Sequence, residues 1–229
     1  MKFFVKVCWL FCSLSLLIQL SAFAATNSVP ENPNQLGIAS VVSQKHIEAV
    51  LTALQLDDAQ KKTEVRDILT AYFLVLKDWH ASHDPQIKPL WNQFNKARSK
   101  QNQAEANVAL AKIQTEYASF SQQHKKFIGD LSALLTPEQV ELVKDTLTVN
   151  KVSVTYKVYL QIFPKLTDEQ MAVVLKNLKA AREEAIDCES MTEKSEFFKK
   201  YKIIIEDDYL TAQGYDPKQA RKDFAAKQK

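Results

Sequence analysis

The sequence predicts an all-α protein, a single multi-helix bundle of about seven to nine helices. Three observations support this fold class. Only 3 glycines occur among 229 residues, whereas tight β-hairpins and nucleotide-binding loops depend on glycine. Apolar residues recur along most of the chain at the spacing of an amphipathic helix. A short motif typical of helix N-termini recurs in several places.

The N-terminus has the pattern of an export signal. Lys2 and Lys6 precede an apolar run over residues 7–20, and "SAFAA" follows it. This pattern predicts a signal peptide over residues 1–24, cleaved after Ala24, and a periplasmic or secreted protein. The run is short for a membrane span, so we expect no stable membrane insertion after cleavage. Residues 25–36 are polar with two prolines and read as a flexible leader, and residues 37–229 form the predicted helical domain.

Composition disfavours several classes of function. Removal of residues 1–24 lowers the formal net charge from +3 to +1, which gives no general attraction for nucleic acid. No GxGxxG, GxxxxGK or GxSxG motif occurs, so we expect neither a nucleotide cofactor nor serine-hydrolase chemistry. Cys188 is the one cysteine outside the signal. We expect it to be a buried apolar residue, with a reactive or intermolecular thiol as the alternative.

The first half of the domain shows clear helical periodicity. A first helix is expected over residues 38–54 and a second over residues 57–84, ended by Pro85 because the residue before a proline disfavours helical geometry. A short apolar segment around residues 90–94 follows. The polar stretch over residues 96–107 is an exposed helix or a turn, and a long helix is expected over residues 113–134.

The pentapeptides "LTPEQ" and "LTDEQ" start two further helices. With Thr136 or Thr167 as the N-cap, Gln139 or Gln170 falls at the third helical position, which makes a capping box. The same frame occurs with an aspartate cap at residues 57–60 and 216–219. The repeated letters therefore indicate helix starts rather than a binding signature.

The second half predicts four more helical segments. Residues 151–163 alternate as a strand would but also fit one helical face, and we favour a helix because no partner strand is evident. Helices are expected over residues 167–188 and 192–213, the latter closed by Gly214. A short basic helix begins at Pro217.

The segments "LTPEQVELVKDTLT", "VTYKVYLQIFPKLTDEQ", "LKAAREEAIDCES" and "YLTAQGYDPKQ" resemble a family of exported Bacteroidetes proteins, the domain of unknown function 3826. The resemblance covers most of the mature chain and is densest over residues 135–220. It implies an exported protein that acts with glycans, because members tend to be encoded near polysaccharide-degradation genes. It supplies no established reaction and no catalytic residue.

The two L-T-x-x-Q pentapeptides also resemble periplasmic stress chaperones of the Spy and CpxP type. That resemblance implies a chaperone-like helical cradle. The capping argument explains how such short matches arise independently.

The stretch "DWHASHD" is the main candidate for chemistry. His80 and Asp84 stand four residues apart on one helical face and could act as a general base and its orienting acid. They could also supply two metal ligands, but two ligands do not make a site, and we predict no metal. Trp79, His83 and Trp91 are candidate ligand-binding residues, although both tryptophans are also typical of a core. We expect His80 to lie beside the apolar stripe, so that its truncation leaves only a small cavity.

Weaker candidates lie further along the chain. "REEAID" contains Arg182 and a pair of carboxylates, Glu183 and Asp187, which glycosidases use but which are also typical of a solvated helix face. Tyr156 and Tyr159 are further candidate ligand-binding residues, with core packing as the alternative.

Three functions remain open from the sequence. The first is a glycan-binding or accessory component of a polysaccharide-utilisation system, with carbohydrate as the partner. The second is a glycan-active hydrolase or lyase that uses His80 with a carboxylate such as Asp84 or Glu183. The third is a chaperone-like protein.

Overall fold

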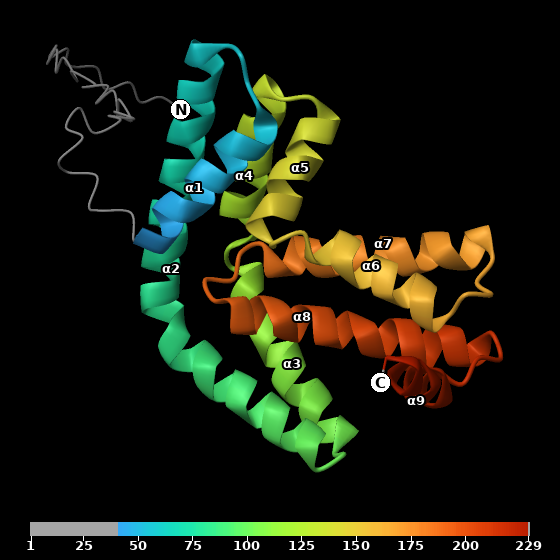
Figure 1. Ribbon diagram of the computed structural model, residues 1–229. Coiled ribbons are helices and arrows are strands. Elements are labelled where there is room, and N and C mark those ends of the chain that lie inside the picture. The colour runs from blue at the N-terminus through green and yellow to red at the C-terminus, as the bar shows by residue number, and fades with distance from the viewer. Residues whose placement is uncertain (1–40, 229) are drawn as a thin grey trace, which may run out of the picture. The chain divides into compact units, whose positions relative to one another are not determined.

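The computed structural model describes residues 41–228, and the predicted signal peptide and leader lie outside them. The described chain is all-α, as predicted, and contains no strand (Figure 1). Its elements are α1 (Val41–Leu54), α2 (Ala59–Ser99), α3 (Gln103–Ala118), α4 (Ser121–Leu134), α5 (Pro137–Leu147), α6 (Lys151–Ile162), α7 (Asp168–Ala185), α8 (Met191–Ile203), the π-helical segment η1 (Ile204–Leu210) and α9 (Pro217–Lys227). No helix in this range is long and apolar enough to cross a membrane.

Helix α2 is far longer than predicted. It continues through Pro85 and Pro89, so the expected end at residue 84 was wrong. Each proline removes one backbone hydrogen-bond donor from the helix. Both prolines are exposed, and the hydrogen bonds on the solvent-facing side of a long curved helix are already lengthened. Buried residues before and after them, including Leu76 and Trp91, hold the helix against the rest of the protein. Figure 1 shows the resulting curve of α2.

Helices α2 and α3 form a hairpin, and the helix expected over residues 113–134 is divided in two. The hairpin turn contains Gln101, which has a positive φ of 57°. The division falls at Ser119 and Phe120, whose backbone N–H groups bond three residues back, to Glu116 and Tyr117. The α-helical ladder therefore ends there, and α4 starts again at Ser121.

The predicted capping boxes are present. Thr136 with Gln139 caps α5, and Thr167 with Gln170 caps α7. Asp216 caps α9 as expected, but α2 is capped by Asp58 rather than Asp57. A further box that was not predicted lies at the start of α8, where Ser190 pairs with Glu193. Residues 151–162 are helical, in agreement with the prediction.

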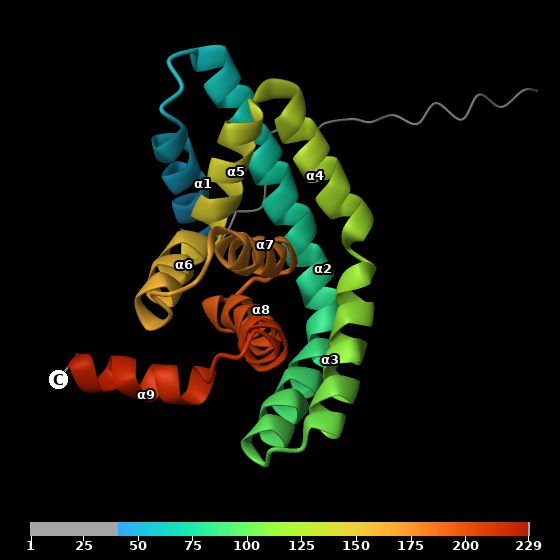
Figure 2. The ribbon, with the colours of Figure 1, turned by 90° about the vertical axis from the view of Figure 1, so that its right-hand side faces the viewer.

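The core consists of two hydrophobic clusters. One gathers buried residues of α1, the first half of α2, α4 and α5, together with Ile186. The other gathers the second half of α2 with α3, α6, α7, α8 and η1. Trp79 packs against both clusters. The connection between α7 and α8, residues 186–190, therefore crosses from one cluster to the other beside the middle of α2 (Figures 1 and 2).

Candidate functional site

The α7–α8 connection is fastened to α2 by hydrogen bonds. The buried Tyr72 hydroxyl lies 2.8 Å from Asp187 Oδ1 and 3.3 Å from the Ile186 carbonyl oxygen. His80 Nε2 lies 2.8 Å from the Asp187 carbonyl oxygen. A carbonyl can only accept, so Nε2 carries the proton and donates it. These hydrogen bonds hold the connection against α2, next to the segment "DWHASHD".

His80 is a buried residue, contrary to the expectation that it lies beside the apolar stripe. Its exposed fraction is 1%. The buried positions on α2 include Leu69, Tyr72 and Leu76, and the next step of four residues reaches His80. The imidazole takes a core position because its two nitrogens both have polar partners there.

Asp84 contacts both the buried His80 and the exposed Lys88. Its Oδ1 lies 2.8 Å from His80 Nδ1, and its Oδ2 accepts a hydrogen bond from the exposed Lys88 at 2.6 Å. Burial alone would raise the pKa of Asp84, but the hydrogen bonds from Lys88 and His80 outweigh it and hold this pKa below its ordinary value. Asp84 is therefore a carboxylate at neutral pH.

The two tryptophan candidates occupy different places. Trp79 stacks on His83, with ring centroids 4.5 Å apart, and donates from Nε1 to Ser119 Oγ at 3.0 Å. Trp91 is buried in the second cluster and meets Phe94 and Phe197 edge-on. Trp79 and His83 thus lie beside His80, whereas Trp91 is a core residue of the second cluster.

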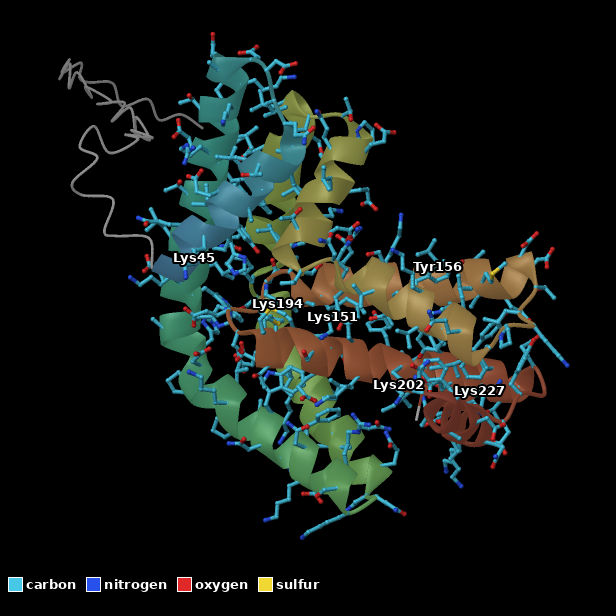
Figure 3. All side chains as sticks on the ribbon, viewed as in Figure 1. Lys45, Lys151, Tyr156, Lys194, Lys202 and Lys227 are labelled. Atoms are coloured by element: carbon cyan, nitrogen blue, oxygen red, sulfur yellow. The ribbon has the colours of Figure 1, made fainter. Side chains whose placement is uncertain are left out.

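The remaining candidates lie apart from this motif. The Tyr159 hydroxyl is buried and donates to Glu206, which Arg221 also contacts. Tyr156 is half-buried on α6 (Figure 3).

Arg182, another candidate, is 1% exposed. Its guanidinium donates to Asp145 at 2.7 Å, Glu141 at 2.8 Å and Glu183 at 3.0 Å. Its two terminal nitrogens therefore bind carboxylates of α5 and α7, while its buried Nε has no hydrogen-bond partner among the described residues.

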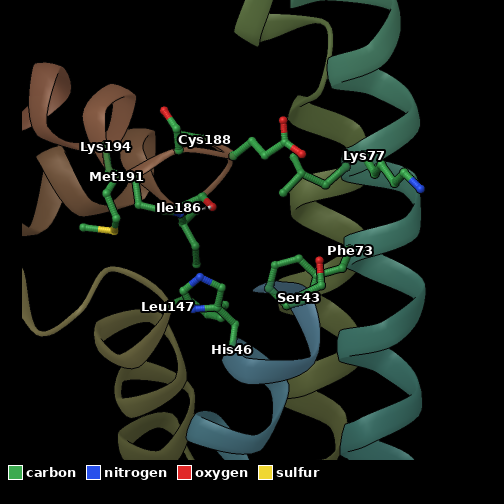
Figure 4. Close-up of a pocket in the computed structure, with 12 residues that line it drawn as sticks. Ser43, His46, Phe73, Lys77, Leu147, Ile186, Cys188, Met191 and Lys194 are labelled. Atoms are coloured by element: carbon green, nitrogen blue, oxygen red, sulfur yellow. Dashed lines mark hydrogen bonds between the residues drawn. The ribbon is translucent and has the colours of Figure 1, made fainter. Parts of the chain in front are cut away.

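A cavity of about 470 Å³ opens beside the α7–α8 connection. Figure 4 shows its walls: α1 provides Ser43 and His46, α2 provides Phe73 and Lys77, and the start of α8 provides Met191. Its lining residues are Ser43, His46, Phe73, Leu76, Lys77, Leu147, Ile186, Cys188, Glu189, Ser190, Met191 and Lys194. Most of the wall is apolar, and a few polar groups reach it, which is the usual make-up of a small-molecule site.

Two basic groups of this cavity have pKa values below their ordinary values. Burial lowers the pKa of Lys194, whose Nζ donates to the carbonyl oxygens of Ala185 and Ile186 at 3.4 and 3.3 Å. Burial and then the charge of Lys194 lower the pKa of His46. His46 is therefore a neutral imidazole at neutral pH, able both to donate and to accept a hydrogen bond. Cys188, as predicted, is buried and reduced, and burial raises the pKa of its thiol, so the thiolate is suppressed.

A second cavity, of about 300 Å³, lies at the other side of the same connection. Glu183, Glu184, Asp187 and His124 contribute polar groups to it. His124 Nδ1 lies 3.0 Å from Asp187 Oδ1, and this hydrogen bond raises the pKa of His124 despite its partial burial. The carboxylates were among the predicted candidates, but His124 was not. No local motif marks it, because its partner lies on a different helix connection.

The family comparison covers the whole of the described region. A family model described as "Protein of unknown function (DUF3826)" matches residues 40–229. This match confirms the resemblance found in the sequence segments. No curated protein matches the chain.

Proposed function

The chain belongs to the DUF3826 family, and from this premise we propose that it is an exported glycan-binding or accessory protein of a polysaccharide-utilisation system. The ligand site in this proposal is the larger cavity, bounded by α1, α2 and the α7–α8 connection. The observation that carries it is the make-up of that cavity: about 470 Å³ with mainly apolar walls and a few polar groups. Carbohydrate as the ligand class rests on the predicted export signal and on the glycan association that the family resemblance implies.

Three features of the cavity support a sugar as its ligand. Phe73 and His46 are stacked at its wall, with ring centroids 6.0 Å apart, and flat rings support the apolar face of a sugar. The neutral imidazole of His46 and the carboxylate of Glu189 can hydrogen-bond sugar hydroxyls. Lys194 holds the end of α7 through two carbonyl oxygens, which keeps the wall in place.

Binding to a glycan array, followed by calorimetric titration of the retained oligosaccharide, tests the proposal. His46→Leu keeps the bulk of the side chain and removes both ring nitrogens, so we expect affinity to fall by about tenfold, the equivalent of one lost hydrogen bond. Gln44→Leu is the matched control, because Gln44 is an exposed neighbour on α1 that does not line the cavity. Retention of no glycan, or equal loss in both variants, would count against the proposal.

A glycan-active enzyme is the second candidate, and the second cavity favours it. His124 and Asp187 form a hydrogen-bonded pair beside Glu183 and Glu184, which supplies a base and acids in one place. In this alternative the general base is His124 and not His80, because His80 is buried in the core. Product release from an oligosaccharide that His124→Gln abolishes without weakening binding would support the enzyme instead. A chaperone-like role stays a third proposal, and both L-T-x-x-Q pentapeptides that suggested it serve as helix caps.

A further inference from the structure

Three potential metal ligands converge where the α7–α8 connection meets the middle of α2. The ligating atoms of His80, Asp84 and Glu189 all lie within 4.8 Å of one another. The sequence alone offered only two of these ligands, on consecutive turns of α2. The third comes from a different part of the chain, and the fold brings it into place.

One ring nitrogen of His80, Nδ1, faces a hydrogen-bond acceptor. Nε2 donates its proton to the Asp187 carbonyl oxygen. In a neutral imidazole, Nδ1 then has only a lone pair, yet Asp84 Oδ1, also an acceptor, lies 2.8 Å away. Two acceptors at this distance repel one another unless a positive species, a proton or a metal ion, lies between or beside them.

The surroundings of His80 are those of a metal ligand. A ligating histidine usually donates its other ring N–H to a carboxylate or a backbone carbonyl, which fixes the tautomer and the ring orientation. The Asp187 carbonyl does this here, and the ring is 1% exposed. The imidazole thus cannot turn away from Asp84.

The other two residues of the cluster are more accessible to solvent than His80. The Asp84 side chain is 14% exposed, and Glu189 is exposed. Lys88 contacts only Oδ2 of Asp84, and its own side chain is 65% exposed, so it can remain there or withdraw while Oδ1 binds a cation. Three protein ligands on one side leave further coordination positions open to water or to another ligand.

We propose that His80 Nδ1, Asp84 and Glu189 form a binding site for a divalent transition-metal ion. One imidazole nitrogen and two carboxylate oxygens suit Zn²⁺ and its neighbours in the first transition row better than Ca²⁺ or Mg²⁺, which prefer oxygen ligands alone. The site does not depend on the glycan proposal. Glu189 also lines the larger cavity, so a bound ion would lie at its margin.

Titration of the metal-free protein tests this site. Protein without an affinity tag is treated with a chelator, dialysed and titrated calorimetrically with Zn²⁺ at neutral pH. We expect one ion per chain. Asp84→Asn and Glu189→Gln each remove one ligand charge with little change in shape, and each should weaken binding by about tenfold or more. Co²⁺ should give visible absorption bands that Glu189→Gln reduces.

Asp78→Asn is the matched control, because Asp78 is an exposed aspartate on the same helix and outside the cluster. It should leave Zn²⁺ affinity unchanged. Circular dichroism of each variant establishes that it is folded. Because Glu189 is exposed, Glu189→Gln should not disturb folding, so it tests the site even if Asp84→Asn destabilises the protein. Absence of Zn²⁺ binding would mean that a proton occupies the place between His80 and Asp84, and it would overturn the proposal. Zn²⁺ binding that both ligand variants leave intact would overturn it too.

Discussion

His80 shows how one polar side chain can belong to a core. Its ring continues the buried stripe of α2, and its nitrogens meet the Asp187 carbonyl and the Asp84 carboxylate. Removal of the ring would leave a cavity and would also leave that partly buried carbonyl without its donor.

We therefore expect His80→Ala to lower the free energy of unfolding by about 2–4 kcal/mol, which combines a core truncation with a lost buried hydrogen bond. For a domain of this size each kcal/mol corresponds to a melting-temperature shift of about 2–4 °C. Thermal denaturation followed by circular dichroism measures the shift. A loss of less than about 2 °C would show that His80 is not a structural residue and would restore the surface position that the sequence suggested.

Residue environments could be predicted where they depend on local sequence. The burial of Cys188 and the caps at Thr136 and Thr167 could be predicted from the neighbouring residues in the sequence. The stripe of Leu69, Tyr72 and Leu76 does extend to His80, but the polar partner of its Nε2, the Asp187 carbonyl, comes from a distant connection and could not be predicted. The pair formed by His124 and Asp187 could not be predicted at all, because the two residues meet only through tertiary packing.

Helix N-termini are the best-determined features at the scale of elements. In α5 and α7 the threonine hydroxyl accepts from the backbone N–H of the third helical residue, and the glutamine side chain accepts from the threonine N–H. Each box satisfies two donors that the helix geometry leaves without partners.

Thr136→Ala and Thr167→Ala should each lower the free energy of unfolding by about 1 kcal/mol. The double variant should lose the sum, because the two caps are on different helices and share no partner. Thr115→Ala is the control: Thr115 is exposed within α3 and bonds only the Ala111 carbonyl, so alanine there should be neutral or stabilising. Chemical denaturation measures all four. Equal losses at the capped and the control positions would contradict the capping account.

Helix boundaries were less predictable than helix starts. Packing on both sides of Pro85 and Pro89 carries α2 through positions where local preference would end it. Conversely, a segment with continuous helical periodicity is divided at Ser119, next to the hydrogen bond from Trp79. In both cases tertiary contacts override the local pattern.

At the scale of the whole described domain, the α7–α8 connection joins two hydrophobic clusters, and both cavities and the His80 cluster border it. Asp187 contributes to this junction through its carbonyl, which His80 contacts, and through its carboxylate, which Tyr72 and His124 contact. The stability of the junction should therefore depend on the charge of His124.

The hydrogen bond to Asp187 raises the pKa of His124 above 6.5 in the folded protein. A histidine whose pKa is raised by folding stabilises the protein fully below its unfolded pKa, and this contribution is lost as the pH rises through the folded pKa. We expect the melting temperature of the native protein to exceed that of His124→Gln more at about pH 6 than at about pH 9. Calorimetric scans at both pH values measure the difference. A gap that is constant or that widens at high pH would contradict the pairing.

We propose that the larger cavity at this junction binds a glycan. Hydrogen–deuterium exchange, measured with and without the oligosaccharide selected on the array, tests it most directly because it reports position as well as binding. The account predicts slower exchange in peptides from the cavity wall, namely around His46 on α1, Phe73 on α2, and Glu189 to Lys194 at the start of α8. Protection confined to α6 and α9, or to the His124 side of the connection, would contradict it.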